Sequence, residues 1–182
     1  MSRKYKFADN DKLYFISFAV MHWIDLFVRK EYNEIMLDSW RYCQKEKGLE
    51  IYVWCIMPSH IHMIIGSQNR ALDKIVGEMK SFTSRSLRKA IAEHPGESRR
   101  EWMVWLMEKS GMKNSNNNEW QLWQQHNNPI EILNTEMFFQ KMEYIHRNPV
   151  EAGLVENEED YLHSSARNFF DKKGLIELSY VV

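Results

Sequence analysis

Two histidines, His60 and His62, flank a single isoleucine in the apolar run MPSHIHMII, residues 57–65. In an extended strand, residues two apart point to the same face, so the two imidazoles would lie side by side. A buried imidazole needs a partner to offset its desolvation, and a neutral pair can grip one divalent cation. Taken alone, such a triplet more often contains two strand histidines that have hydrogen-bond partners or are half-exposed to solvent. A metal site therefore requires a third ligand and a reactive group.

A second motif, QKMEYIHRNPVEAGLV, carries a tyrosine and an asparagine one helical turn apart, Tyr144 and Asn148. A helix is predicted from Glu136 to about Asn148, because Thr135 can cap its first turn and Pro149 restricts its predecessor. At 100° per residue, Tyr144 and Asn148 are separated by about 40° on one face. The expected core stripe lies elsewhere on the helix and consists of Phe138, Phe139, Met142 and Ile145. The pattern presents Tyr144 outward, although a tyrosine packed at the core rim with Asn148 as a C-terminal cap has the same geometry.

The elements that must position these motifs are predicted in the order strand, helix, strand, strand, helix, with a further strand and helix later. Strands are expected at 13–20, 49–57 and 60–65, and helices at 31–47 and about 71–92. Gly48 is placed to end the first helix, and Pro58-Ser59 separates two strands by a tight connection. The stripe expected to bury the second helix is Leu72, Ile75, Val76, Met79, Phe82 and Leu87. The order resembles a ferredoxin-like α/β sandwich, an α+β fold with helices packed on an antiparallel sheet.

Composition limits the class of protein. The 182 residues are 44% hydrophobic and 27% charged, which is typical of a globular chain, and we expect one domain over residues 1–182. Cys43 and Cys55 lack zinc-ligand spacing, so both are interpreted as packing residues in a reducing compartment. No apolar run is long enough to span a bilayer and no signal peptide is evident. We therefore expect a cytoplasmic protein with no membrane partner.

Charge is distributed unevenly, although the formal net charge is only −1. The range from Arg70 to Lys113 contains ten basic and six acidic residues. This surplus of basic residues could bind a polyanion. The candidate phosphate contacts are Lys80, Arg85, Arg88, Arg99 and Arg100, and the candidate base-stacking residues are Trp102, Trp105, Trp120 and Trp123. Charged side chains on helices are usually solvated, and tryptophans usually belong to the core. For each of these residues, a solvated charge or a core position is therefore the stronger interpretation.

The segment from about Pro95 to Asn128 is the least regular part of the chain. A helix is predicted to open at Ser98-Arg99-Arg100-Glu101, which has the capping-box pattern, and to stop near Gly111. Residues 113–128 are rich in amides and are predicted to form a loop and a short strand pinned by Trp120, Leu122 and Trp123.

Taken together, the motifs resemble those of the single-tyrosine HUH transposases. The histidine pair after Pro58, the segment YIHRNPV and the following AGLV are most similar to the REP-associated tyrosine transposase-like proteins, as is the C-terminal segment EDYLHSSARNFF. The resemblance implies a ferredoxin-like catalytic domain in which His60 and His62 bind a divalent metal, Mg²⁺ or Mn²⁺. Tyr144 would be the nucleophile. Asn148 would occupy the position of a third metal ligand, where relatives outside this subgroup often have the longer glutamine.

The activity implied by this resemblance is cleavage and rejoining of single-stranded or hairpin DNA through a 5′-phosphotyrosine intermediate. Members of the family work as monomers or as dimers with swapped catalytic helices, so a monomer or a homodimer is expected. The insert at about 95–128 departs from compact members and leaves assembly and hairpin recognition open. Two alternatives remain: a nucleic-acid-binding protein of the same fold that acts on structured repeats without cutting, and an RNA-binding module that stacks bases on its sheet.

Overall fold

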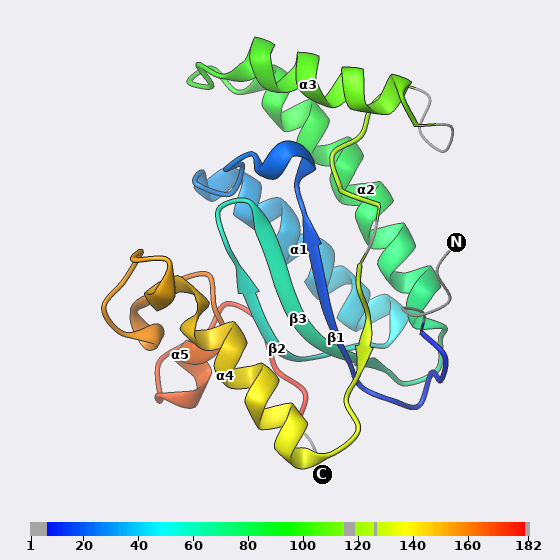
Figure 1. Ribbon diagram of the computed structural model, residues 1–182, viewed down its shortest axis with the longest axis vertical. Coiled ribbons are helices and arrows are strands. Elements are labelled where there is room, and N and C mark those ends of the chain that lie inside the picture. Colours follow the sequence, from blue (N-terminus) through cyan, green and yellow to red (C-terminus); the bar gives the residue numbers. More distant parts are fainter. Residues whose placement is uncertain (1–6, 115–118, 126, 181–182) are drawn as a thin grey trace.

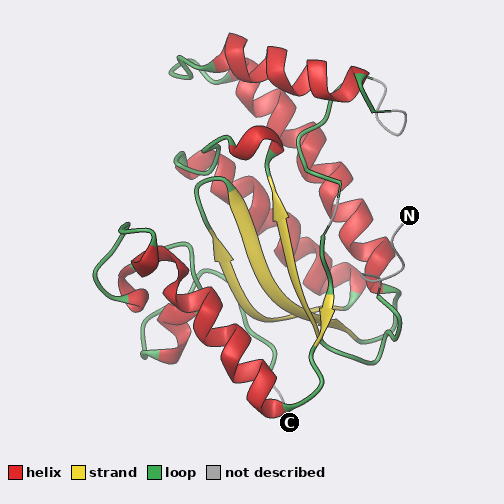
Figure 2. Ribbon diagram, viewed as in Figure 1, coloured by secondary structure: helices red, strands yellow, loops and turns green. Residues whose placement is uncertain are grey.

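The computed structural model describes residues 7–114, 119–125 and 127–180. Its centre is a four-stranded antiparallel sheet with strand order β2-β3-β1-β4 (Figures 1 and 2). The strands are β1 (Tyr14–Ala19), β2 (Leu49–Ile56), β3 (His60–Ser67) and β4 (Ile130–Glu131). The predicted ferredoxin-like α+β fold is confirmed, and the strands predicted at 13–20, 49–57 and 60–65 lie within one or two residues of β1, β2 and β3. The short strand predicted within 113–128 does not form in the described part of this segment, which has only isolated bridge positions such as Trp123 with Val20. Residues 115–118 and 126 of the segment lie outside the described residues.

Helices cover both faces of the sheet. They are α1 (Lys30–Lys47), α2 (Leu72–Glu93), α3 (Arg100–Met112), α4 (Thr135–Glu151) and α5 (Ala166–Phe169), with single 3₁₀ turns η1 (Met21–Trp23) and η2 (Glu158–Asp160). Helix α1 lies behind the sheet in Figure 1, α4 lies on the opposite side, and α3 crosses the end of α2 at the top. Within the described ranges, every helix is too short or too polar to span a bilayer.

Strand alternation divides the buried side chains between these two layers. Ile16, Phe18 and Ile61 belong to the larger core with α1 and α2, whereas Phe15 and Ile64 belong to a smaller core with Ile145 of α4. His62 shares the parity of Ile64 and therefore lies on the α4 side. The histidine pair is thus carried by a central strand on the less heavily covered face.

The β2–β3 hairpin fixes the position of this pair. The backbone N–H of Met57 donates to the carbonyl of His60 at 2.8 Å, which closes the turn over Pro58 and Ser59. In the register, His62 stands between Ser17 of β1 and Cys55 of β2. Both cysteines are buried and free, as predicted for packing residues.

Helix α4 differs from its prediction at both ends. Asn134, not Thr135, is the N-cap, and its side chain accepts a hydrogen bond from the N–H of Met137 at 2.8 Å. The helix also continues through Pro149 to Glu151, because the buried proline ring packs inward and the N–H of Leu154 reaches its carbonyl at 2.9 Å. Gly153, with φ of 69°, then supplies the left-handed residue that ends the helix.

The burial pattern and the start of α3 also need correction. Phe139 and Phe82 were assigned to core stripes but are 54% and 49% exposed. The capping box at Ser98 does not form, and Arg99 is the N-cap without a side-chain cap bond. Instead, the buried carboxylate of Glu97 accepts from the N–H of Arg99 at 3.2 Å. A long-range ion cluster around Glu97 therefore takes the place of the local side-chain cap that the sequence predicted for α3.

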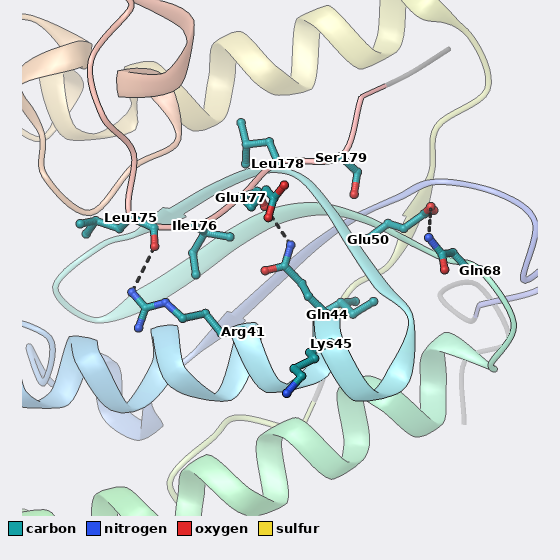
Figure 3. A pocket seen from close by; sticks show the side chains of 11 residues that line it. Arg41, Gln44, Lys45, Glu50, Gln68, Leu175, Ile176, Glu177, Leu178 and Ser179 are labelled. Carbon is teal, nitrogen blue, oxygen red and sulfur yellow. Dashed lines mark hydrogen bonds between the residues drawn. The ribbon is translucent and has the colours of Figure 1, made fainter.

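The C-terminal segment covers the free edge of β2. The N–H of Ser179 donates to the carbonyl of Ile51 at 2.8 Å. From α1, the side chain of Arg41 donates to the carbonyl of Leu175 at 3.1 Å and that of Gln44 to the carbonyl of Glu177 at 2.8 Å (Figure 3). Pairing of this kind removes an open strand edge, which would otherwise be a template for aggregation.

Candidate active site

The two imidazoles of the HIH triplet lie side by side on the α4 face of the sheet. The ring centroids of His60 and His62 are 4.8 Å apart, with the planes nearly perpendicular. His62 is only 5% exposed, and neither of its ring nitrogens has a hydrogen-bond partner among the described residues. A buried imidazole with two unused nitrogens is costly in a folded protein unless a ligand binds there.

The electrostatic surroundings keep both rings neutral at pH 7. Burial lowers the pKa of His62 to about 3, and positive charge on His60 and Lys141 adds to this effect. Burial also lowers the pKa of His60, which a side-chain hydrogen bond with Asn148 and the Asp25 carboxylate partly oppose. Neutral imidazoles keep a nitrogen lone pair free, which metal coordination requires.

Tyr144 approaches this pair from α4. Its ring centroid lies 5.3 Å from that of His62 and 6.0 Å from that of Phe15, both in edge-on contacts. The side chain is 45% exposed, so the outward orientation predicted from helical spacing is confirmed. Asn148, one turn further along α4, contacts His60 through its side chain. The structure therefore brings together all four residues of the two motifs within one chain.

His146 holds α4 in this position. It is 3% exposed, and its Nε2 lies 2.9 Å from Ser165 Oγ. Ser165 Oγ also accepts from the N–H of Trp54 in β2 at 2.9 Å and donates to the carbonyl of Trp54 at 3.1 Å. Helix α4 is thereby tied to the edge of the sheet two residues after Tyr144.

Three neighbours of the site were not identified from sequence. Phe15 of β1 stacks on His62 with ring centroids 5.7 Å apart. Lys141 places its Nζ 5.1 Å from the ring centroid of Phe15 and 6.0 Å from that of Tyr144. Trp23, 59% exposed, has its ring centroid 5.5 Å from that of His60. The spacing of Lys141, three residues before Tyr144, could have indicated it, whereas nothing local points to Trp23.

The five proposed phosphate-binding residues lie elsewhere, and all five have partners within the chain. Lys80 is half-buried, and its Nζ donates to Gln124 O at 3.0 Å and to Asn127 Oδ1 at 2.6 Å. Arg99 binds Glu97, and Arg100 donates to the carbonyls of Ile91 and His94. Arg88 pairs with Glu108, and exposed Arg85 reaches Ser81 of its own helix. Among the described contacts, none of the five joins the histidine–tyrosine site.

The four candidate stacking residues separate into two groups. Trp102 and Trp105 of α3 are 50% and 55% exposed, so their rings are accessible. Trp123 is 5% exposed and donates from Nε1 to Thr83 Oγ1 at 3.1 Å, which makes it a core residue that pins its segment as predicted. Trp120 is half-buried, with the guanidinium of Arg88 5.1 Å from its ring centroid.

The arrangement defines a ferredoxin-like domain with a histidine pair and a tyrosine at one open site. Residues 22–107 match the family model described as "Transposase IS200 like". This segment contains His60 and His62 and ends before α4. This match agrees with the resemblance to the single-tyrosine transposases that the sequence motifs indicate.

Two solved structures are similar to the chain. One, described as "Structure of the REP associates tyrosine transposase bound to a REP hairpin", has a TM-score of 0.68 at 16% identity and covers 100% of this chain and 92% of that chain. The other is a putative transposase from Deinococcus radiodurans R1, with a TM-score of 0.46 at 17% identity over 73% of this chain and 87% of that chain. The first likeness shows a shared fold. None of the curated proteins matches this sequence.

Proposed function

We propose that this protein is a transposase that cleaves and rejoins single-stranded or hairpin DNA through a covalent link to Tyr144. The observation that carries the proposal is the approach of the half-exposed phenol of Tyr144 to the buried, unpartnered imidazole of His62, with ring centroids 5.3 Å apart. A structural histidine at this depth would have hydrogen-bond partners, and the half-exposed phenol beside it is accessible to a substrate. Both features are expected at a reactive site.

The proposed reaction is a transesterification. The oxygen of Tyr144 attacks the phosphorus of a phosphodiester, the bond from phosphorus to the 3′ oxygen breaks, and a proton passes from the phenol to the departing 3′ oxygen through solvent. The products are a 5′-phosphotyrosyl link and a free 3′-hydroxyl. Ionising a phenol of ordinary pKa at pH 7 costs about 4 kcal/mol, so nearby positive charge must favour the reaction. A phenolate is also a good leaving group, so a 3′-hydroxyl can reverse the step and reseal DNA.

A divalent cation fits the residues present. The ring nitrogens of His62 are buried and have no hydrogen-bond partner among the described residues. His60 lies beside His62, and Asn148 contacts His60. We propose that these three side chains hold Mg²⁺ or Mn²⁺, which when bound would polarise the phosphate oxygens. Across the described residues, no group of three or more His, Cys, Asp or Glu side chains is placed to hold a metal. An amide and oxygens from water or substrate would therefore complete the shell.

The chain's own residues account for positioning. Phe15 stacks on His62 and holds the ring plane, while the tie from His146 to Ser165 fixes the rotation of α4. Lys141 supplies a fixed positive charge beside the phenol. Because the histidines and the tyrosine come together in a single chain, we propose that each protomer contains a complete site, whether the protein acts as a monomer or as a homodimer.

Unpaired DNA suits this site better than a duplex. Tyr144 lies on a helix face beside the sheet, where a flexible single strand can bring its backbone close to the phenol. The similar solved structure is of a tyrosine transposase bound to a REP hairpin, which supports a hairpin substrate.

Covalent trapping tests the proposal. Incubation with Mn²⁺ and DNA hairpins that carry single-stranded flanks should give a protein–DNA adduct that survives SDS. Tyr144→Phe should abolish it and His62→Ala should reduce it at least a hundredfold, whereas Tyr42→Phe, a change at an exposed tyrosine of α1, should leave it intact. Retention of the adduct in Tyr144→Phe would refute the assignment of the nucleophile. DNA binding without any adduct would favour the non-catalytic alternative.

A further inference from the structure

A cavity of about 710 Å³ opens between η1, α3 and the segment 121–125. Its lining includes the apolar side chains of Met21 and Leu106 and several amide side chains, among them that of the exposed Gln125. Volumes of this order accommodate small organic ligands, and an apolar wall with a few polar groups is typical of such sites. None of the candidate site residues named from the sequence lines this cavity.

Its charge distinguishes it from two other hollows in the described part of the chain. The cavity in Figure 3 includes Glu50 and Glu177, and a groove between α1 and α2 includes Asp38 and Glu78. Around the cavity beside α3, the charged lining residues are Lys109 and Lys113, with no acidic side chain among them. The Nζ of Lys109 lies 4.5 Å from the ring centroid of exposed Trp105, so an ammonium group and an aromatic face adjoin at the rim. This combination favours an anionic, aromatic ligand.

A strained turn connects the cavity to the active site. His22 and Trp23 both have left-handed backbone, with φ of 57° and 55°. The side chain of His22 lines the cavity, where its Nε2 lies 2.9 Å from Ser110 Oγ. The ring of Trp23, the next residue of η1, contacts that of His60. Such strain persists only where surrounding contacts enforce it, and it is concentrated at functional sites.

We propose that this cavity binds one nucleotide of the unpaired strand that flanks the phosphodiester cleaved at Tyr144. The base would pack on Met21 and Leu106 and meet the amide of Gln125 at its edge, and its phosphates would contact Lys109 and Lys113. The inference rests on the proposed function, since it assumes a single-stranded DNA substrate. It assigns strand binding to Lys109 of α3 and to Lys113, which directly follows this helix, and not to the five basic residues expected from sequence.

The experiment measures equilibrium binding of DNA by protein carrying Tyr144→Phe, so that no chemistry intervenes. The probes are a DNA hairpin with an oligothymidine tail and the same hairpin without it. Each phosphate contact to a single strand contributes about 0.7 to the slope of log K against log salt concentration. Lys109→Ala with Lys113→Ala should therefore reduce the magnitude of the slope by about 1.4 for the tailed hairpin and leave the slope for the untailed one unchanged. Gln125→Ala should weaken tail binding without changing the slope.

A matched control is the pair Lys45→Ala and Lys89→Ala, which removes two exposed ammonium groups from α1 and α2. It should leave both slopes unchanged. The proposal is overturned by an unchanged slope in the Lys109/Lys113 variant, by an equal loss with both hairpins, or by an equal loss in the control. Failure of the proposed function is separate, because it appears as absence of the Tyr144 adduct in the otherwise unaltered protein.

Discussion

The imidazole of His146 lies 2.9 Å from the hydroxyl of Ser165, and that hydroxyl also bonds both backbone groups of Trp54. One buried oxygen thus connects helix α4 with strand β2. Because His146 is two residues from Tyr144 on the same helix, this connection sets where the phenol stands relative to the histidine pair. The position of the nucleophile depends on a residue of the C-terminal segment.

Replacement of Ser165 by alanine should therefore destabilise the protein. The N–H of Trp54 and the ring of His146 would lose a buried partner, which costs about 1–3 kcal/mol of unfolding free energy. Urea unfolding measures this loss. The matched change Ser98→Ala should cost less than about 0.5 kcal/mol, because Ser98 is exposed and caps no helix. A large loss at Ser98 would restore the capping-box prediction, and a negligible loss at Ser165 would contradict the proposed connection.

Replacement of His62 by leucine should separate stability from activity. The imidazole is buried with both nitrogens unpartnered, so an apolar side chain of similar size removes a desolvation cost. In a chelator, the variant should be as stable as the unaltered protein or more stable, by up to about 2 kcal/mol. It should lose both adduct formation and any stabilisation by Mn²⁺. Marked destabilisation in the chelator would show that His62 has a structural role.

Lys141→Met should change the electrostatics of the site without removing a metal ligand. Burial is the main cause of the lowered pKa of His62, and the charge of Lys141 adds to it, so the pKa of His62 should rise in the variant. Loss of a positive charge beside the phenol should also slow adduct formation about tenfold, which corresponds to ~1.4 kcal/mol. NMR titration of the histidine rings and a time course of trapping measure the two effects. Lys45→Met should change neither.

Glu97 should make stability depend on acid. Burial by itself raises the pKa of this carboxyl, but hydrogen bonds from Arg29 and Arg99 lower it to about 2. The unfolded chain takes up the proton near pH 4.5 and the folded chain only near pH 2, so the contribution is complete above pH 5. It falls as the pH decreases through this window, by at most about 3 kcal/mol.

The check is the difference in unfolding free energy between the unaltered protein and Glu97→Gln, measured from pH 6 down to pH 3. This difference should narrow as the solution becomes more acidic. A difference that stays constant over the range would show that Glu97 does not titrate with folding.

Local periodicity was sufficient to predict which side chains of the two motifs lie on the same face of a strand or helix. A period of two placed His60 and His62 together, and a period of 3.6 placed Tyr144 and Asn148 on one face of α4. Both follow from backbone geometry within a few residues, so tertiary contacts leave them unchanged. The family resemblance followed from the same short motifs, and the order of strands and helices gave the fold.

Choices between local alternatives of similar energy were not determined in this way. Asn134 and Thr135 are both good caps, and Phe138 and Phe139 are equally apolar. Which of each pair is used depends on how α4 meets the sheet. Ser98 is a plausible cap by sequence, but the neighbouring Glu97 binds Arg29 and Arg99, the residues that directly precede α1 and α3.

The sequence by itself determined the fold class and the two pairs of reactive side chains, because each depends on residues close together in the chain. Only the tertiary structure decided that the pairs meet, since His62 and Tyr144 lie on different elements and the packing of α4 sets the 5.3 Å between their rings. It also decided which cations stay available: Lys80 and Arg100 bind carbonyls within the fold, whereas Lys109 and Lys113 face an open cavity. The sequence gives the number of charged side chains, and packing determines which of them remain free to bind a ligand.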